Sequence, residues 1–236
     1  MHGKIHEIYS SISGEGISQG IPTVFVRFAG CSLRCGKTDT RSLWCDTPYA
    51  LGPNQGETKP LSTIMDEIVA LDPTHGYQIL LTGGEPLEGK NRDLSISIAQ
   101  SIHSFRTHND KPYPSSRVET NGSEKITLDP FFIFTMDYKL PGSGMEGRMD
   151  LENFQILEKR HNSLDEIKFV VRDRIDFERS IEVIREQKIQ TNILYSPVHG
   201  EVDAKELVEW IKIDNPPKCR LSLQIHKVLW GNQKGV

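Results

Sequence analysis

The feature that most constrains the fold is a regular alternation of short apolar runs with longer segments whose apolar residues recur at helical spacing. The apolar runs predict strands at residues 4–9, 23–28, 77–82, 116–120, 131–138, 167–171, 191–195 and 220–225. Helices are predicted at residues 62–71, 92–105, 151–160, 176–187 and 203–213, with Ser62 as the cap of the first. Because parallel strands need crossover connections of this kind, the pattern predicts an α/β fold with a mostly parallel sheet.

The number of strand–helix units limits how far this sheet can close. About six crossover strands in 236 residues fall short of the eight units and roughly 250 residues of a closed barrel. We therefore predict a partial barrel of the (β/α)6 type. No linker or internal repeat divides the chain, so residues 1–236 are expected to form a single domain, with an N-terminal β extension and a loop insertion at residues 36–60.

Composition argues against several classes of partner. The formal net charge is −4 and no block of Lys or Arg occurs, so we expect no nucleic-acid partner. No window approaches the roughly 18 apolar residues of a membrane helix, and the first residues lack the apolar core of a signal peptide. Clustered rather than scattered cysteines are typical of a reducing compartment. These features predict a cytoplasmic protein with no membrane partner.

Three of the four cysteines, Cys31, Cys35 and Cys45, lie close together directly after the predicted strand at residues 23–28. Such crowding is typical of a metal site. The thiolates suit a structural zinc ion, with Cys219 or a distant histidine as fourth ligand, or an iron–sulfur cluster. A four-iron cluster on three cysteines would leave one iron open to a substrate or cosubstrate. Three ordinary buried thiols are the plainer alternative.

Polar clusters begin where several predicted strands end. They are Cys31, Gly83-Gly84-Glu85, Asn121-Gly122, Lys139 and Ser196-Pro197. Because the carboxyl ends of parallel strands form one edge of a sheet, and ligands bind there, we expect these clusters to share one site. A structural metal would not need the other loops to be chemically equipped, so this arrangement favours catalysis.

Together, the cysteine loop and Gly83-Gly84-Glu85-Pro86 resemble those of radical S-adenosylmethionine enzymes. The fuller set of motifs is similar to that of the 7-carboxy-7-deazaguanine synthase family. The matching motifs are Ile12-Ser13-Gly14-Glu15-Gly16, Phe25-Val26-Arg27-Phe28-Ala29-Gly30-Cys31, Trp44-Cys45-Asp46-Thr47, Glu119-Thr120-Asn121-Gly122, Asp137-Tyr138-Lys139 and Gln224-Ile225-His226-Lys227. They run from the first predicted strand to the last, so the resemblance covers nearly the whole chain.

The resemblance implies a [4Fe–4S] cluster held by Cys31, Cys35 and Cys45, whose open iron takes the amino and carboxylate groups of S-adenosylmethionine. One electron would cleave the sulfonium to give a 5′-deoxyadenosyl radical, which abstracts hydrogen from 6-carboxy-5,6,7,8-tetrahydropterin. Ring contraction with loss of ammonia then yields 7-carboxy-7-deazaguanine, in queuosine and deazapurine biosynthesis. The resemblance further implies Mg²⁺ bound through Thr47, a flavodoxin or ferredoxin-type electron donor, and a homodimer.

The resemblance also assigns ligand contacts to individual residues. The cofactor-binding set is Gly83, Gly84, Glu85, Asn121, Asp137, Tyr138 and Lys139. The substrate-binding set is Ile12, Ser13, Gly14, Glu15, Arg27, Thr82 and His226. Within this set the guanidinium of Arg27 is expected to fork onto the substrate carboxylate, and His226 to hold the polar edge of the substrate.

The sequence departs from the family pattern in three places. Nine residues separate Cys35 from Cys45, where two are usual; Ser13 stands where a glutamine is common; and the chain continues past His226 to Val236. Two other hypotheses remain open. A glycyl-radical activase would share the cysteines and Gly-Gly-Glu but would not explain Arg27, and a zinc-binding module would have no enzymatic activity.

Overall fold

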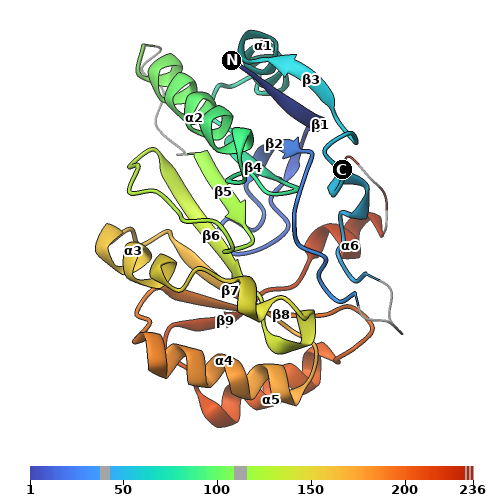
Figure 1. Cartoon of the computed structure of the whole chain (residues 1–236), viewed down its shortest axis with the longest axis vertical. Coiled ribbons are helices and arrows are strands. Elements are labelled where there is room, and N and C mark those ends of the chain that lie inside the picture. Colours follow the sequence, from blue (N-terminus) through green and yellow to red (C-terminus); the bar gives the residue numbers. More distant parts are fainter. Residues whose placement is uncertain (38–42, 109–115, 232, 234, 236) are drawn as a thin grey trace.

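The computed structural model describes residues 1–37, 43–108, 116–231, 233 and 235, and within them a nine-stranded sheet runs through the molecule (Figure 1). The strands are β1 (His2–Ile12), β2 (Pro22–Phe28), β3 (Glu57–Pro60), β4 (Gln78–Gly83), β5 (Ser116–Thr120), β6 (Phe132–Tyr138), β7 (Glu166–Val171), β8 (Asn192–Pro197) and β9 (Cys219–Leu221). Their order in the sheet is β3-β1-β2-β4-β5-β6-β7-β8-β9.

Parallel pairing dominates this sheet. All neighbours from β2 to β9 pair in parallel, whereas β1 pairs antiparallel with both β2 and β3. The two edges, β3 and β9, lie at opposite ends of the strand order, so the sheet is open and curved rather than a closed barrel. The predicted α/β class, partial barrel and mostly parallel sheet are therefore confirmed.

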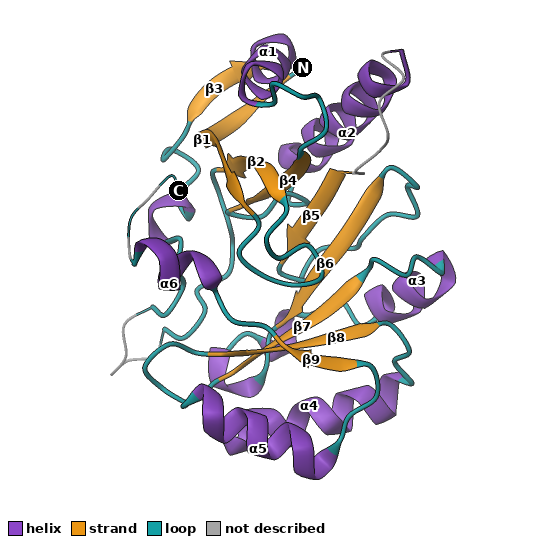
Figure 2. Cartoon of the chain, turned by 180° about the vertical axis from the view of Figure 1, so that it is seen from behind, coloured by secondary structure: helices purple, strands orange, loops and turns teal. Residues whose placement is uncertain are grey.

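Helices flank the sheet on both sides. They are α1 (Leu61–Leu71), α2 (Lys90–His108), α3 (Glu152–Arg160), α4 (Arg174–Gln187), α5 (Ala204–Asp214) and α6 (Ile225–Trp230), with short 3-10 helices η1 (Pro48–Ala50), η2 (Pro141–Ser143) and η3 (Glu146–Arg148). Figures 1 and 2 show α2 and α3 along one side of the sheet and α6 on the opposite side. Every helix among the described residues is too short or too polar to cross a lipid bilayer.

The parallel strands divide their side chains between two faces, because successive residues of a strand point in opposite directions. On β7, Ile167, Phe169 and Val171 are buried in the hydrophobic core together with apolar residues of α1 to α5. The intervening residues, Glu166 and Lys168, belong to the other face. That second face is polar on most of the strands, and it carries the site described below.

The chain following the cysteines differs from the prediction. Residues 57–60, assigned to the loop insertion, form the edge strand β3, which pairs with β1. Their polar sequence has no apolar alternation because the strand is largely exposed. Ser62 is not the helix cap either. Pro60 holds that position without a side-chain bond, and the amide of Leu61 donates instead to the carbonyl of Met1 at 3.0 Å.

The predicted last strand, residues 220–225, is wrong in its second half. β9 ends at Leu221, and Ile225 begins helix α6. The alternation that predicted a strand included Leu223, which is 39% exposed and so reflects no buried face. Beyond the amide of Ser222, which donates to the Tyr195 carbonyl at 2.8 Å, the backbone turns away, and Ile225 donates to Gly14.

Candidate active site

A cavity of about 590 Å³ opens at the carboxyl ends of the parallel strands, on the polar face of the sheet. Most of the residues predicted for the site line it. These are Ile12, Gly14, Glu15, Arg27, Cys31, Cys35, Cys45, Thr47, Thr82, Gly83, Gly84, Asn121, Asp137, Lys139 and His226. Three predicted residues, Ser13, Glu85 and Tyr138, lie outside the lining, as do Ser196 and Pro197 at the end of β8.

The two ends of the long segment between Cys35 and Cys45 lie next to each other. The amide of Trp44 donates to the carbonyl of Cys35 at 3.3 Å, which closes the segment at its base. The indole ring of Trp44 lies directly on Gly36, where an added Cβ would come within 2.7 Å of it. Residues 38–42 lie outside the described ranges. The neck formed by Cys35, Gly36 and Trp44 keeps Cys35 and Cys45 at the same cavity despite their spacing.

The cysteine thiols have an environment suited to a metal. All are free, and burial raises the pKa of Cys31 to about 11, so its thiolate needs a nearby positive charge to form. The amide nitrogen of Asn121 donates to the sulfur of Cys31 at 3.5 Å. Within the described ranges, no three His, Cys, Asp or Glu side chains converge closely enough to hold a single metal ion. A four-iron cluster takes one thiolate per iron and does not need that convergence.

The glycine turn after β4 lies tightly against the cysteine loop. Gly83 has a φ of +110°, and a Cβ on Gly84 would lie 2.0 Å from the carbonyl oxygen of Gly30. The amide of Gly84 donates to Phe28 at 2.9 Å, and that of Glu85 donates to Gly30 at 2.7 Å. Only glycine fits here, and the turn presents bare backbone to the cavity.

Glu85 holds this turn from beneath rather than facing the cavity. Its carboxylate is fully buried and accepts from the amides of Leu87 and Asn121 at 2.9 and 2.7 Å and from the Thr120 hydroxyl at 2.8 Å. Desolvation outweighs these bonds and raises the pKa of Glu85 to about 7. The partners of Glu85 are therefore local backbone and hydroxyl groups, although the sequence places it in the cofactor-binding set.

The end of β6 contributes two of its three predicted residues to the cavity. The ammonium of Lys139 pairs with the Asp137 Oδ2 at 2.7 Å, and Oδ1 of Asp137 is buried without a hydrogen-bond partner among the described residues. Tyr138 points to the opposite face, as alternation along a strand requires. Its ring packs against Phe154 and Phe169, and its hydroxyl donates to Glu146 at 3.2 Å, so its predicted ligand contact is corrected.

Arg27 on β2 is held on one edge and open on the other. Its Nε donates to Glu7 at 2.7 Å and its Nη2 to the Tyr9 hydroxyl at 3.0 Å. The guanidinium also lies about 6 Å from the ring centres of Tyr9 and Tyr49. Its Nη1 makes no hydrogen bond to any described residue. An anion in the cavity would therefore contact the terminal nitrogen Nη1 rather than the Nε side of the guanidinium.

The glycine-flanked loop at residues 13–20 packs against the start of α6. The amide of Ile225 donates to the carbonyl of Gly14 at 3.1 Å, and a Cβ on Gly14 would lie 2.3 Å from His226 Nδ1. Desolvation lowers the pKa of His226, so the imidazole is neutral near pH 7. Ser13 is buried, with its hydroxyl 2.8 Å from that of Ser18, and so shapes the loop instead of facing the cavity.

Sequence reasoning assigned no ligand contact to several charged or polar residues that line the cavity, although four of them belong to the quoted motifs. They are Asp46, Tyr49, Glu119, Lys168, Gln224 and Lys227. The Thr82 hydroxyl donates to Glu119 at 2.8 Å, and Gln224 donates to Asp46 at 3.2 Å. A usable signal existed on the strands, because an ionisable residue inside an otherwise apolar run, such as Lys168 in the predicted strand at residues 167–171, marks a face that is not part of the core.

Comparison with known proteins gives two kinds of match, although no protein-family model matches the chain. A 7-carboxy-7-deazaguanine synthase from Leptospira interrogans is 56% identical over 233 residues, covering 98% of this chain and 97% of the relative. The synthase from Clostridium acetobutylicum is 35% identical over 246 residues, covering all of both chains.

Among solved structures, the crystal structure of QueE from Escherichia coli matches with a TM-score of 0.67 and covers 95% of this chain and 94% of its own. At 23% sequence identity this is a likeness of fold. The sequence matches carry the assignment further, because they extend over nearly the full length of both proteins. On this evidence the chain belongs to the 7-carboxy-7-deazaguanine synthase family.

Proposed function

We propose that this protein is a radical S-adenosylmethionine enzyme that converts 6-carboxy-5,6,7,8-tetrahydropterin into 7-carboxy-7-deazaguanine with loss of ammonia, a step of queuosine biosynthesis. One observation carries the proposal. A single cavity is lined both by three free cysteines and by Arg27, whose open edge suits a carboxylate. A glycyl-radical activase needs the first feature and not the second, and a zinc module needs neither the glycine turn nor Arg27.

The residues around the cysteines fit the two cofactors. Cys31, Cys35 and Cys45 would hold the [4Fe–4S] cluster, and when bound, the cluster and S-adenosylmethionine supply the radical that starts the ring contraction. The turn at Gly83 and Gly84 offers backbone to the amino-acid part of adenosylmethionine. Oδ1 of Asp137, which has no hydrogen-bond partner in the described part of the chain, is an acceptor for a ligand hydroxyl or ammonium, since a buried acceptor left unpaired is costly.

The remaining residues would bind and orient the pterin. Nη1 of Arg27 would receive the substrate carboxylate, with Glu7 and Tyr9 holding the other edge of the guanidinium. Glu15 and the neutral His226 present acceptors to the N–H groups of the pterin ring. The loop at residues 13–20 and the start of α6 cover the cavity beside them, which limits the access of water during the reaction.

We extend the proposal to a magnesium ion, an electron donor and a homodimer. The Thr47 hydroxyl lines the cavity 3.6 Å from the Cys45 sulfur, and a hard cation accepts such an oxygen while keeping several waters. Thr47→Ala should raise the Mg²⁺ concentration needed for half-maximal activity.

The cluster requires one electron from outside, so a flavodoxin or ferredoxin-type donor is the partner we propose.

The test is anaerobic reconstitution followed by incubation with adenosylmethionine, dithionite and the carboxylated pterin. We expect iron and labile sulfide in the protein, and 7-carboxy-7-deazaguanine and ammonia as products. Cys31→Ala, Cys35→Ala and Cys45→Ala should each remove the visible absorbance of the cluster, while Cys219→Ala, outside the cavity lining, should retain it.

Two results would contradict the proposal in different ways. One zinc ion per chain with no iron or sulfide would exclude the radical chemistry. Reductive cleavage of adenosylmethionine without consumption of the pterin, at any Mg²⁺ concentration, would keep the radical enzyme and exclude this substrate.

A further inference from the structure

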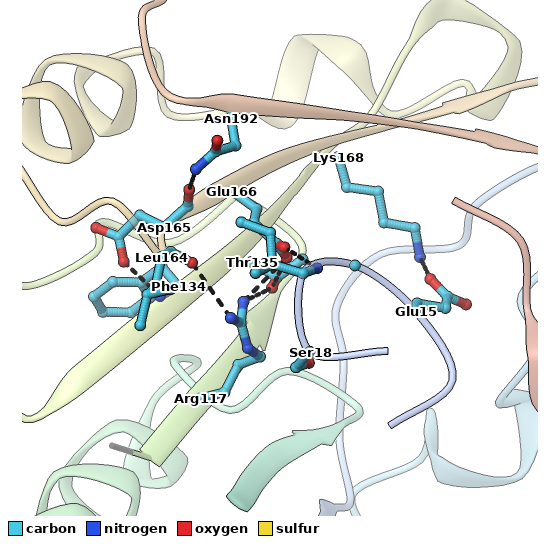
Figure 3. Close-up of polar contacts among 12 residues, drawn as sticks. Glu15, Ser18, Arg117, Phe134, Thr135, Leu164, Asp165, Glu166, Lys168 and Asn192 are labelled. Atoms are coloured by element: carbon cyan, nitrogen blue, oxygen red, sulfur yellow. Dashed lines mark hydrogen bonds and ion pairs between the residues drawn. The ribbon is translucent and has the colours of Figure 1, made fainter. Parts of the chain in front are cut away.

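The loop at residues 13–20 crosses the open side of the sheet and is held by strand β7. It leaves β1, which four strands separate from β7 in the sheet order. Two contacts attach it to β7. The Ile17 amide donates to the Glu166 carboxylate, and Glu15 forms an ion pair with Lys168 (Figure 3). The amide of Gly16 also donates to the Ser222 hydroxyl at 3.1 Å. The loop is therefore fixed by residues about 150 or more positions further along the chain.

Glu166 is a rigid anchor for this loop. Its carboxylate is 1% exposed and accepts from Nη1 of Arg117 at 3.0 Å and from the Thr135 hydroxyl at 2.9 Å. A Cβ on Gly16 would lie 2.6 Å from Oε2 of Glu166, so the loop backbone rests directly on that carboxylate. Because Glu166 is paired and buried on all sides, it can hold the backbone of the loop in one place.

Lys168 lies two residues further along β7 and therefore on the same face as Glu166. Its ammonium pairs with the carboxylate of Glu15, and the two side chains are 15% and 14% exposed. Desolvation lowers the pKa of Lys168, but Glu15, Asp137 and Glu119 together outweigh it and raise that pKa, so the ammonium stays charged. Without this cation, the carboxylates of Glu15 and Glu119, whose charges repel each other, would lose a shared counter-charge, and Glu15 would be displaced.

We propose that Lys168 is a positioning residue for substrate binding, which holds the Glu15 carboxylate in the orientation that accepts hydrogen bonds from the substrate. Glu166 anchors the loop at the Ile17 amide, and Lys168 anchors it a second time through the side chain of Glu15, which it also orients. This rests on the proposed function, in which Glu15 contacts the pterin. Lys168 acts through Glu15 and is not itself assigned to a bond with substrate.

A double-mutant cycle in the reconstituted enzyme tests this directly. Lys168→Met keeps a long unbranched side chain without the charge, and Glu15→Gln keeps the shape of Glu15 while removing the ion pair. Each single change should raise KM for the pterin roughly tenfold or more, with a smaller effect on kcat. Lys168→Met in the Glu15→Gln background should change KM less than twofold, because the partner is already lost.

Two further variants make the result specific. Lys168→Arg should restore most of the wild-type KM, because it retains a cation. Lys205→Met, an exposed lysine of α5, should match the wild type. If the Lys168→Met and Glu15→Gln effects on KM multiply, or if Lys168→Met changes kcat alone, Lys168 does not act through Glu15 and the proposal is wrong.

Amide hydrogen exchange of residues 13–20 gives a readout that needs no turnover. Lys168→Met should speed exchange in this loop while leaving the core strands protected, and Lys205→Met should change neither. Unchanged exchange in the loop would overturn the proposal. If the wild-type protein fails to bind or consume the pterin, the proposed function fails, and the exchange data still report whether Lys168 holds the loop.

Discussion

The two faces of the central sheet are built for different purposes from the same strands. On β7 the outer residue Phe169 is fully buried among aromatic rings, while its neighbour Lys168 turns to the cavity and pairs with Glu15. On β2, Val26 belongs to the core and Arg27 to the cavity. The outer face removes apolar surface from water, which is the main source of stability.

The cavity face instead places charges where water is partly excluded. Its ion pairs contribute little net stability, since desolvation of both partners offsets much of their attraction. Mutations of neighbouring residues on one strand should therefore change different measured quantities. Outer residues should change the free energy of unfolding, and cavity residues should change the kinetics.

The largest effect should come from the outer face. Phe169→Ala removes a buried ring that packs 5.9 Å from Tyr138 and 5.8 Å from Tyr195, and should lower the free energy of unfolding by about 3–5 kcal/mol. Urea denaturation followed by circular dichroism measures this. Phe169→Leu, which leaves a smaller void, is the matched control and should lose less. A loss below about 1 kcal/mol would show that the outer face is not the main source of stability.

Glu85 is buried beneath the glycine turn that follows β4 and should show its effect through pH. Its pKa is about 7 in the folded chain against 4.5 as its ordinary value, so the folded state keeps a proton that the unfolded state releases between these values. Its contribution to stability is therefore fully present below pH 4.5 and is lost as the pH rises through 7. The loss amounts to roughly 3 kcal/mol.

Glu85→Gln has no carboxyl group that can titrate at this position. Between pH 4.5 and 7.5, the wild type should therefore lose roughly 3 kcal/mol of unfolding free energy relative to this variant. Urea titrations at several pH values measure this difference. A constant difference over the whole range would mean that Glu85 titrates normally.

Arg27→Lys should affect the cavity face alone. The ammonium keeps a charge but loses the planar fork, so KM for the pterin should rise roughly tenfold, equivalent to about 1.4 kcal/mol of binding. The free energy of unfolding should change far less than in Phe169→Ala. Arg174→Lys, on the exposed part of α4, serves as the control. Unchanged steady-state kinetics in Arg27→Lys would remove this residue from the substrate site.

The smallest effect should come from a helix cap on the outer side. Asp203 accepts from the amide of Lys205 at 2.8 Å at the start of α5. Asp203→Ala should lower the free energy of unfolding by about 1 kcal/mol and leave KM unchanged. A change in KM would mean that the two faces are coupled through α5.

Local patterns were sufficient to predict most elements. The strand at residues 116–120 coincides with β5, and the helix at residues 151–160 with α3 to within one residue, because their periodicities arise from burial on one face. The glycine and cysteine motifs were placed correctly at one cavity, since parallel strands bring their carboxyl ends together.

What could not be predicted depends on register and on distant contacts. Tyr138 was assigned to the ligand because adjacent residues of one motif were treated alike, although one step along a strand reverses the face. Lys168 drew no attention because its partner Glu15 is 153 residues away. Ile225, the first residue of α6, continues the apolar alternation of Leu221 and the exposed Leu223, so the start of this helix could not be predicted from the local pattern.

The neck at Cys35, Gly36 and Trp44 has a consequence for how such chains vary. The Trp44–Cys35 backbone hydrogen bond and the contact of the Trp44 ring with Gly36 hold the two ends of the segment together. The distance between Cys35 and Cys45 therefore does not depend on how many residues lie beyond the neck. Length can then be gained or lost there without moving Cys35 away from Cys45. The spacing of cysteines along a chain is therefore a weaker criterion for such a cluster than the presence of residues able to close the neck.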